Sequence, residues 1–252
     1  MRIDLTGKVA LVTGGGRDIG RAVSLGLAGA GAAVVVNYYD NPDDAHAVVA
    51  DICAGGGRAI AVRADVTSTA DVERLVAEGR RAFGGQIHIL VNNAGGLVGR
   101  KRLVEMDDAF IDLLITLNFK SVAYVSRAVI PFMPAGGAIV NLSSLAAHDG
   151  GGPGATMYAA GKGAVLTLTR GLAKELGPQQ IRVNCVSPGM INTTFHNTFT
   201  KPEARLATAA RTCAGREGEA ADVANAIVFL ASDAAAYITG ESLEINGGLY
   251  FV

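Results

Sequence analysis

Short β-branched runs alternate with longer stretches of helical pattern along the whole chain, and this alternation is the strongest constraint on its fold. The runs are mostly apolar, as strands covered on both faces of a sheet must be. Between them, stretches such as residues 71–83 carry apolar residues at three- and four-residue spacing. The runs are KVALVT (8–13), AVVVNY (33–38), AIAVRA (59–64), IHILVN (87–92), AIVNLS (138–143), IRVNCV (181–186) and SLEIN (242–246).

Strand alternating with helix implies parallel strands joined by right-handed crossovers. No linker, repeat or low-complexity tract interrupts the pattern over the 252 residues. We therefore predict one domain, residues 1–252, with a doubly wound α/β fold. Its seven-stranded, mainly parallel sheet should carry helices on both faces, and its ligand should bind over the carboxyl ends of the strands, where the strand order reverses.

Charge and cysteine content exclude several kinds of partner. The formal net charge of −1 gives no basic surface for nucleic acid. The three cysteines lie far apart and are odd in number, which indicates a reducing compartment rather than a disulfide framework. The N-terminus has no secretory pattern, and proline and glycine punctuate the longest uncharged stretch, residues 128–147. We expect a soluble, cytoplasmic protein with no nucleic-acid or membrane partner.

A glycine-rich stretch, TGGGRDIG (13–20), follows the first predicted strand and opens a helix. Residues without a Cβ let backbone amides approach a pyrophosphate closely, and a helix N-terminus adds partial positive charge. Glycines alone are a weak signal, because an ordinary turn between strand and helix also uses them. An acid, Asp18, stands within the stretch and would repel an anion.

The chain resembles the short-chain dehydrogenase/reductases over nearly its whole length. The resemblance implies a Rossmann-like fold, a nicotinamide dinucleotide cofactor, a small-molecule carbonyl or alcohol substrate, and a substrate-binding loop at about residues 190–215. The motifs stand in the family's order and at about its spacings. They are TGGGRDIG (13–20), ADV (64–66), NNAG (92–95), Asn118, NLSS (141–144), YAAGK (158–162), SPG (187–189) and YITGESLEINGG (237–248).

By this resemblance, residues from several parts of the chain bind the cofactor. Asp18 occupies the family's central glycine. We expect its side chain to point away from the pyrophosphate, where it can cap the following helix, with Arg17 offsetting its charge. The implied cofactor residues are Gly14, Arg17, Asp18, Ile19, Gly20, Asn37, Tyr38, Asp65, Val66, Asn92, Ala94, Gly95, Tyr158, Lys162, Pro188, Gly189, Ile191 and Thr193.

The end of the second predicted strand bears on the choice of cofactor. NAD-specific relatives place an acid there to bind the adenosine 2′-hydroxyl, whereas a 2′-phosphate needs the acid absent and a cation near. Tyr38 occupies this position, with Asn37 before it and Arg17 in the glycine-rich stretch. The sequence therefore predicts NADP(H) over NAD(H), although Asp40 is near enough to keep NAD(H) open.

Tyr158 and Lys162 are four residues apart, which places them on one face of a predicted helix. A lysine ammonium beside a phenol should lower the phenol's pKa from about 10. The resemblance implies that Tyr158 is the general acid/base, that Lys162 also holds the nicotinamide ribose, that Ser144 hydrogen-bonds the substrate oxygen and that Asn118 carries a water in the proton relay. The alternative is a surface tyrosine beside a solvated lysine.

The overall pattern is similar to that of 3-oxoacyl-(acyl-carrier-protein) reductases, which dock an acidic carrier protein on basic residues in two loops. The corresponding loops here, residues 131–138 and 176–181, contain no Lys or Arg. An acidic carrier would therefore lack its main steering charges. Such a reductase of fatty-acid synthesis remains the alternative to the substrate predicted below.

Three loops that border the predicted site, residues 92–101, 146–158 and 192–205, resemble those of relatives that reduce small sugar-derived carbonyl acids. Arg100 and Lys101 are then candidates to bind a substrate carboxylate, and His148 and His196 to bind hydroxyls. A solvated loop is the alternative for Arg100 and Lys101. The four histidines lack the spacing of a metal site, so we predict none.

Two functions other than catalysis are the alternatives to an enzyme. A catalytically silent dinucleotide sensor would typically lack the Tyr or Lys, and a purely structural oligomer would bind no dinucleotide. Relatives commonly form homotetramers through two long helices and an apolar C-terminus, and this chain ends INGGLYFV. We expect a homotetramer, with a dimer as the alternative.

Overall fold

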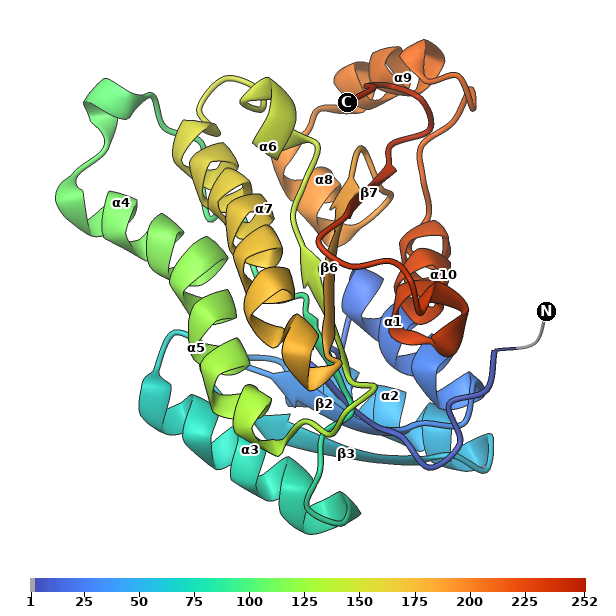
Figure 1. Ribbon diagram of the computed structural model, residues 1–252. Coiled ribbons are helices and arrows are strands. Elements are labelled where there is room, and N and C mark those ends of the chain that lie inside the picture. Colours follow the sequence, from blue (N-terminus) through green and yellow to red (C-terminus); the bar gives the residue numbers. More distant parts are fainter. Residues whose placement is uncertain (1–2) are drawn as a thin grey trace.

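The computed structural model describes residues 3–252, which form a sheet with helices on both faces (Figure 1). All neighbouring strands are parallel, in the order β3-β2-β1-β4-β5-β6-β7. The strands are β1 (Val9–Val12), β2 (Ala33–Tyr38), β3 (Arg58–Arg63), β4 (Ile89–Asn92), β5 (Ala138–Leu142), β6 (Arg182–Pro188) and β7 (Ser242–Ile245).

Ten α-helices occur within the described residues, together with shorter helical turns. The α-helices are α1 (Asp18–Gly29), α2 (Pro42–Ala54), α3 (Thr69–Phe83), α4 (Asp108–Ile115), α5 (Ser121–Val129), α6 (Ala146–Asp149), α7 (Thr156–Leu176), α8 (Thr194–Phe199), α9 (Pro202–Arg211) and α10 (Ala220–Ala231). The turns are η1 (Leu103–Glu105), η2 (Thr116–Lys120), η3 (Ile130–Phe132), η4 (Gly177–Gln179) and η5 (Asp233–Ala235).

Each of the seven predicted runs forms a strand, so the predicted doubly wound fold is confirmed. The sheet was predicted to be mainly parallel, and in the structure all of its strand pairs are parallel. The strand order reverses between β1 and β4, which pair directly although 76 residues separate Val12 from Ile89 in sequence. The expected crevice for a ligand therefore lies beyond the carboxyl ends of these two strands.

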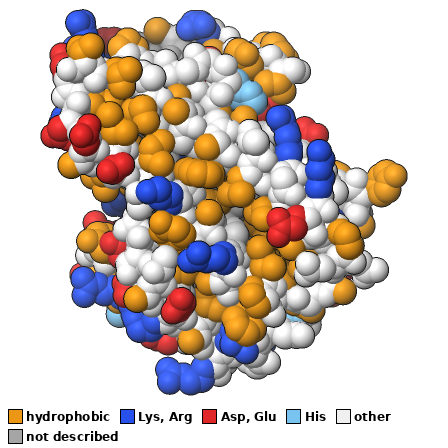
Figure 2. All heavy atoms as spheres, turned by 60° about the vertical axis from the view of Figure 1, so that its left-hand side comes forward, with side chains coloured by type: hydrophobic (Ala, Val, Ile, Leu, Met, Phe, Trp, Pro, Cys, Tyr) orange, Lys and Arg blue, Asp and Glu red, His pale blue; other side chains and the backbone are white. Residues whose placement is uncertain are grey.

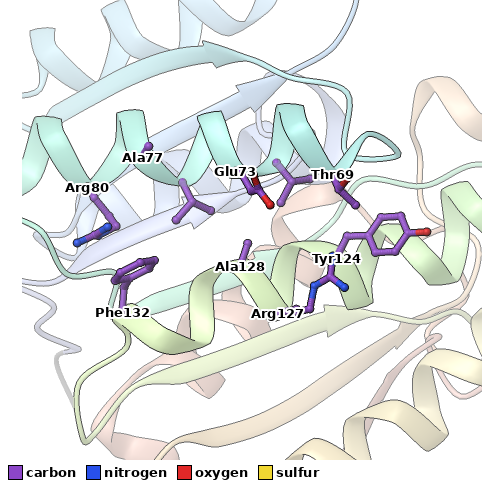
Figure 3. A pocket seen from close by; sticks show the side chains of 10 residues that line it. Thr69, Glu73, Ala77, Arg80, Tyr124, Arg127, Ala128 and Phe132 are labelled. Carbon is purple, nitrogen blue, oxygen red and sulfur yellow. The ribbon is translucent and has the colours of Figure 1, made fainter.

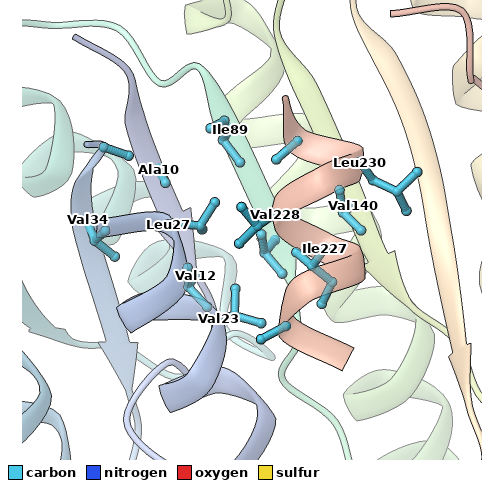
Figure 4. Close-up of a cluster of buried hydrophobic side chains, with 14 of the residues drawn as sticks. Ala10, Val12, Val23, Leu27, Val34, Ile89, Val140, Ile227, Val228 and Leu230 are labelled. Atoms are coloured by element: carbon cyan, nitrogen blue, oxygen red, sulfur yellow. The ribbon is translucent and has the colours of Figure 1, made fainter. Parts of the chain in front are cut away.

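Two hydrophobic clusters fill the space on the two faces of the sheet. Alternate residues of the central strands face opposite sides, so Val12 joins the cluster beneath α1 and α10, whereas Leu11 joins the cluster beneath α3, α5 and α7. Figure 4 shows the first cluster, in which Val23 and Leu27 of α1 meet Ile227 and Val228 of α10. Burying each such side chain contributes about 1.5–3 kcal/mol.

The stretch 107–133, which has an unbroken helical pattern, is divided in the structure. After α4, the chain makes one wide turn of π type at η2 before continuing as α5 and η3. By length and composition, Asp108–Phe132 could cross a membrane, but core helices of soluble proteins pass the same test. The division matters for the site, because the wide turn contains Asn118.

Candidate active site

The glycine-rich loop between β1 and α1 is held in place by two asparagine side chains, one at the end of β2 and one just after β4. Asn37 at the end of β2 accepts a hydrogen bond from the Gly14 amide (3.1 Å) and donates to the Ala64 carbonyl (3.0 Å). Asn93, after β4, donates to the carbonyls of Thr13 (2.9 Å) and Gly14 (3.0 Å). Gly14 has a φ of +60°, which favours glycine. The protein's own hydrogen bonds therefore hold the shape of this loop.

Asp18 adopts a φ of +50° and begins α1, but no side chain caps that helix. The expectation that Asp18 caps α1 is therefore wrong. Its Oδ1 instead accepts hydrogen bonds from the backbone amide (3.0 Å) and the hydroxyl (3.2 Å) of Thr194, at the start of α8. The Asp18 carboxylate thus caps α8, which begins 176 residues further along the chain, and not α1.

Several features of the described residues fit a dinucleotide in this crevice. Gly20 has no room for a side chain, because a Cβ there would lie 2.0 Å from the Gly14 carbonyl oxygen. A Cβ on Gly95 would lie 3.1 Å from Lys162 Nζ, so this glycine keeps the space beside that lysine open. Within residues 3–252 the exposed Arg17 guanidinium has no hydrogen bond or ion pair, which leaves it free for an anion.

The residues predicted to flank the adenosine lie at the ends of β2 and β3. Asn37 is buried and committed to the backbone, whereas Tyr38 is half-buried and its ring stands edge-on to His46 (6.0 Å between centroids). Asp65 is half-buried and accepts from the amide (2.8 Å) and hydroxyl (2.6 Å) of Thr67, and Val66 is buried. Asn37 therefore shapes the loop and has no free amide to offer a ribose.

Asn118 lies in the wide turn η2 and is fully buried. Its side chain accepts from the Gly96 amide (3.0 Å) and donates to the carbonyls of Gly96 (2.9 Å) and Leu114 (3.0 Å). These bonds join the helix to the segment after β4, next to Gly95. Single π-type turns in helices occur frequently at functional sites.

Ser144, Tyr158 and Lys162 come together where β5 ends and α7 begins. Ser144 follows β5, and its hydroxyl forms a hydrogen bond with that of Tyr158. Lys162 lies one helical turn beyond Tyr158, is 4% exposed, and donates to the Leu142 carbonyl (2.8 Å). Its Nζ lies 5.8 Å from the centre of the Tyr158 ring. The structure therefore assembles the predicted catalytic group.

Burial controls the ionisation of both groups. It raises the pKa of Tyr158, with the Ser144 hydrogen bond opposing the rise, and lowers the pKa of Lys162 to about 8. The expectation that Lys162 lowers the pKa of the phenol is therefore wrong in direction for the protein alone. The Lys162 ammonium donates its hydrogen bond to the Leu142 backbone carbonyl and not to the Tyr158 hydroxyl.

The remaining predicted cofactor residues lie in or next to the segments that follow β1, β4 and β6. The Leu145 amide donates to the Pro188 carbonyl (2.9 Å), which ties the Ser144 loop to the end of β6. Asn92 is buried and donates to Asn141 (2.8 Å), so its side chain supports the sheet, whereas the Ala94 amide donates to the Thr13 hydroxyl oxygen (3.0 Å). Also at this edge are Ile19, Gly189, Ile191 and Thr193.

Two of the candidate substrate residues make contacts within the rim of the site. Arg100 donates to the carbonyls of Phe199 (3.2 Å) and Pro153 (2.9 Å), so it bridges α8 and the loop before α7. Lys101 places its ammonium 4.4 Å from the centre of the Phe110 ring. Both cations therefore have partners within the protein, and their role in binding a substrate carboxylate stays a prediction.

The two candidate histidines face different surroundings. His148 in α6 lies 3.1 Å from a Glu244 carboxylate oxygen, although their geometry does not make a hydrogen bond, and it stacks on Tyr250. His196 in α8 bonds to Thr200 (2.9 Å), and burial lowers its pKa. His148 thus joins α6 to the C-terminal segment, while His196 is a neutral group on α8.

Phe195, which sequence reasoning missed, faces Tyr158. Its ring centre lies 5.8 Å from that of Tyr158 and 5.4 Å from that of Phe199. Asn93 and Thr13, which hold the glycine loop, were missed as well. Their positions within the motifs TGGGRDIG (13–20) and NNAG (92–95) were the available signal, but only the pairing of β1 with β4 brings them together.

A groove of about 390 Å³ lies elsewhere, between α3 and α5 (Figure 3). Glu73 and Arg80 line it from α3, and Tyr124 and Phe132 from the opposite side, with the Arg80 guanidinium 3.4 Å from the centre of the Phe132 ring. None of its lining residues belongs to the predicted site. The groove is therefore separate from the predicted site.

Comparisons with known proteins agree with this geometry. A family model described as "Enoyl-(Acyl carrier protein) reductase" matches residues 14–250. A 3-oxoacyl-[acyl-carrier-protein] reductase of Synechocystis is 41% identical over 251 residues, covering 97% of this chain and 98% of the relative.

Two crystal structures share the fold. A dehydrogenase/reductase of Sinorhizobium meliloti has a TM-score of 0.94 at 37% identity, covering 99% of this chain and 98% of its own. A short-chain dehydrogenase of Burkholderia cenocepacia, in complex with NADP, has a TM-score of 0.91 at 38% identity, covering 97% and 98%. By sequence, fold and assembled site, this chain belongs to the short-chain dehydrogenase/reductase family of oxidoreductases.

Proposed function

We propose that the protein is an NADP(H)-dependent carbonyl reductase, or the reverse alcohol dehydrogenase, that acts on a small polar or acidic carbonyl compound derived from a sugar. The observation that carries the reaction class is the group of Ser144, Tyr158 and buried Lys162 beside a preformed glycine loop. We further propose that the residues 1–252 act as one cytoplasmic domain. A silent dinucleotide sensor would have no use for this intact group.

Within this proposal, the chain's own residues bind, orient and move a proton. The bound nicotinamide supplies or accepts the hydride. Tyr158 gives a proton to the carbonyl oxygen, or takes it back in the reverse reaction, while Ser144 hydrogen-bonds the same oxygen. Lys162 binds the ribose, and Asn118, whose amide already joins η2 to Gly96, orders a water in the proton relay.

The free guanidinium of Arg17 supports NADP(H) as the cofactor. It is exposed at the glycine loop, and Tyr38 rather than an acid ends β2. A 2′-phosphate needs a nearby cation and no acid at the end of β2, and Arg17 and Tyr38 meet these two needs, with Asp40 two residues further on as the competing carboxylate. The NADP complex of the related Burkholderia protein favours the same choice.

Arg100 carries the proposal about the substrate. It is exposed and bridges the two segments that border the site, α8 and the loop at Pro153, through only its Nε and one Nη. The rest of the guanidinium can bind a substrate carboxylate. The alternative, a 3-oxoacyl-(acyl-carrier-protein) reductase, is favoured by the name of the Synechocystis relative, but it would have to dock its carrier without basic residues in the loops 131–138 and 176–181.

A substrate panel separates the two proposals. Keto-sugar acids and acetoacetyl thioesters should be assayed with each cofactor by the absorbance of the reduced nicotinamide. We expect a keto-sugar acid to be the better substrate, and Arg100→Ala to raise its KM about tenfold with kcat within about threefold of wild type. Arg127→Ala, on the distant helix α5, is the matched loss of a surface arginine and should leave both constants unchanged. Faster turnover of the thioester, with a normal Arg100→Ala variant, would favour the fatty-acid reductase.

A homotetramer is part of the proposal. Figure 2 shows hydrophobic side chains gathered along the middle of the face on which α4, α5 and α7 lie. Leu113 of α4 is 44% exposed in the single chain, and the terminal Phe251 and Val252 are each 77% exposed. Contact with further copies of the chain would cover these groups.

A further inference from the structure

Helix α8 covers the catalytic tyrosine but is too short to be stable by itself. It has six residues, and isolated helices of fewer than about twelve residues do not persist in water. Phe195 and Phe199 on this helix form an aromatic row that ends against Tyr158. The position of α8 must therefore depend on bonds to other parts of the chain.

The first turn of α8 lacks a cap from its own neighbours. Thr193 is its N-cap residue, yet the Thr193 hydroxyl is turned to the Ile191 carbonyl (3.1 Å) and caps nothing. The Asp18 carboxylate supplies the cap instead, accepting from both the amide and the hydroxyl of Thr194. Removing such a charged acceptor leaves an unsatisfied amide at the helix start.

Asp18 itself is held in an unfavourable backbone conformation. A φ of +50° is the left-handed region, which glycine adopts without strain and an L-residue such as Asp adopts less readily. Strained residues persist where the surrounding structure holds them, and they cluster at functional sites. A glycine at position 18 would relieve the strain and lose the bonds to Thr194. The chain therefore keeps an acid where a glycine would fit its backbone better.

We propose that Asp18 is a positioning residue that latches α8 over Tyr158 and thereby joins the glycine loop to the substrate-covering helix. The latch itself is a contact within the protein. Its second effect rests on the function proposed above: the same carboxylate stands at the loop that receives the pyrophosphate, so it weakens dinucleotide binding while it holds the lid. Asp18 therefore lowers the affinity for the cofactor and raises the affinity for the substrate.

Proteolysis of the dinucleotide-free protein tests the latch without any turnover. Chymotrypsin cleaves after Phe195 and Phe199 only when α8 opens, so the rate follows the open population. Cleavage after the fully exposed Tyr237 is the internal reference. We expect Asp18→Gly to raise the cleavage rate at α8 about tenfold, and Asp18→Asn, which keeps an acceptor, to raise it no more than about threefold.

A double-mutant cycle distinguishes a latch from general loosening. Thr194→Val removes the hydroxyl and keeps the amide, so it should raise cleavage about threefold. When combined with Asp18→Gly it should add nothing, because the hydroxyl has already lost its partner. The matched control is Asp51→Asn, an exposed acid paired with Arg21 on α1, and it should behave as wild type.

Binding and kinetics then test the exchange of affinities. Dinucleotide Kd should fall in both Asp18→Gly and Asp18→Asn, whereas the substrate KM should rise about tenfold only in Asp18→Gly, with kcat within about threefold. Wild-type cleavage rates in Asp18→Gly, or additive effects in the double variant, would overturn the latch even in an active enzyme. If no variant binds a dinucleotide but the cleavage pattern holds, the latch stands and the proposed function fails.

Discussion

Burial away from water is enough by itself to lower the pKa of the Lys162 side chain. Its ammonium has a carbonyl, not a carboxylate, as its partner, so burial is not offset by an opposite charge and lowers its pKa to about 8. The lysine therefore gives up its proton far more readily than an exposed lysine would. Retaining it costs stability, which is expected for a group that serves binding and catalysis.

That cost predicts a pH dependence of folding. Between pH 8 and 10.5 the unfolded lysine holds a proton that the folded lysine has lost, so this group makes the free energy of unfolding rise with pH across that window. Lys162→Met, which cannot titrate, should be the more stable protein at pH 7. Its advantage over wild type should shrink by about 3 kcal/mol by pH 10.5. Urea unfolding at several pH values measures this, and a constant difference would contradict the burial argument.

Tyr158→Phe tests the proton donor directly. The variant keeps the ring that packs on Phe195 but has no hydroxyl to donate, so we expect kcat to fall about a thousandfold, within the range for general acid catalysis. Dinucleotide Kd, measured by fluorescence titration, should stay within about twofold of wild type. Tyr124→Phe on α5 controls for the loss of a phenol away from the site. Near wild-type turnover in Tyr158→Phe would remove the assignment.

The sequence pattern predicted which residues come together better than it predicted the conformations around them. Tyr158 and Lys162 were located by their spacing on one helix, and their convergence with Ser144 followed from the family resemblance. The partner of Asp18 could not be predicted, because Thr194 lies 176 residues away and nothing local to either residue indicates the bond. Likewise, the pKa of Tyr158 depends on burial, which a motif does not reveal.

Among the elements, strands were more predictable than helices. Every predicted β-branched run became a strand, because only apolar residues can occupy positions covered on both faces. The division of the stretch 107–133 was not predicted, since its apolar spacing continues through the wide turn η2. Asn118 accounts for that turn by bonding to Gly96, a residue of a different segment. An asparagine in the middle of an apolar helix was the available signal.

Helices α8 and α9 are also held by contacts with residues far from them in sequence. Arg205 on α9 forms an ion pair with Glu217 and also donates to Asn192 and Asn197, so it fastens the far side of the lid as Asp18 fastens the near side. The Arg205 guanidinium lowers the pKa of Glu217. The sequence pattern in 192–205 indicated a distinctive loop, but it did not reveal which residues hold it.

At the scale of the whole molecule, the site draws on segments from Thr13 to Thr194, so a ligand that fills it should stabilise the entire fold. A ligand at a hundredfold excess over its Kd adds about 2.7 kcal/mol to the free energy of unfolding. For a chain of this size we expect NADPH to raise Tm by about 5–10 °C under that condition, measured by differential scanning fluorimetry. NADH at the same concentration should give a smaller shift.

The arginine at the glycine loop provides the control for that measurement. Arg17→Ala removes the proposed partner of the 2′-phosphate, so it should reduce the NADPH shift and leave the NADH shift unchanged. Arg21→Ala, one turn along α1, is the matched variant and should respond as wild type. Equal shifts for NADPH and NADH in the wild-type protein would contradict the proposed cofactor.

The order of strands also sets when the growing protein can first meet its cofactor. The bonds that shape the glycine loop join Thr13 to Asn93, 80 residues further along, and β1 has no partner on one edge until β4 exists. A ribosome adds about 5–20 residues per second. The glycine-rich loop of the nascent chain therefore lacks these bonds for several seconds, and a dinucleotide can aid folding only after residue 93 has been made.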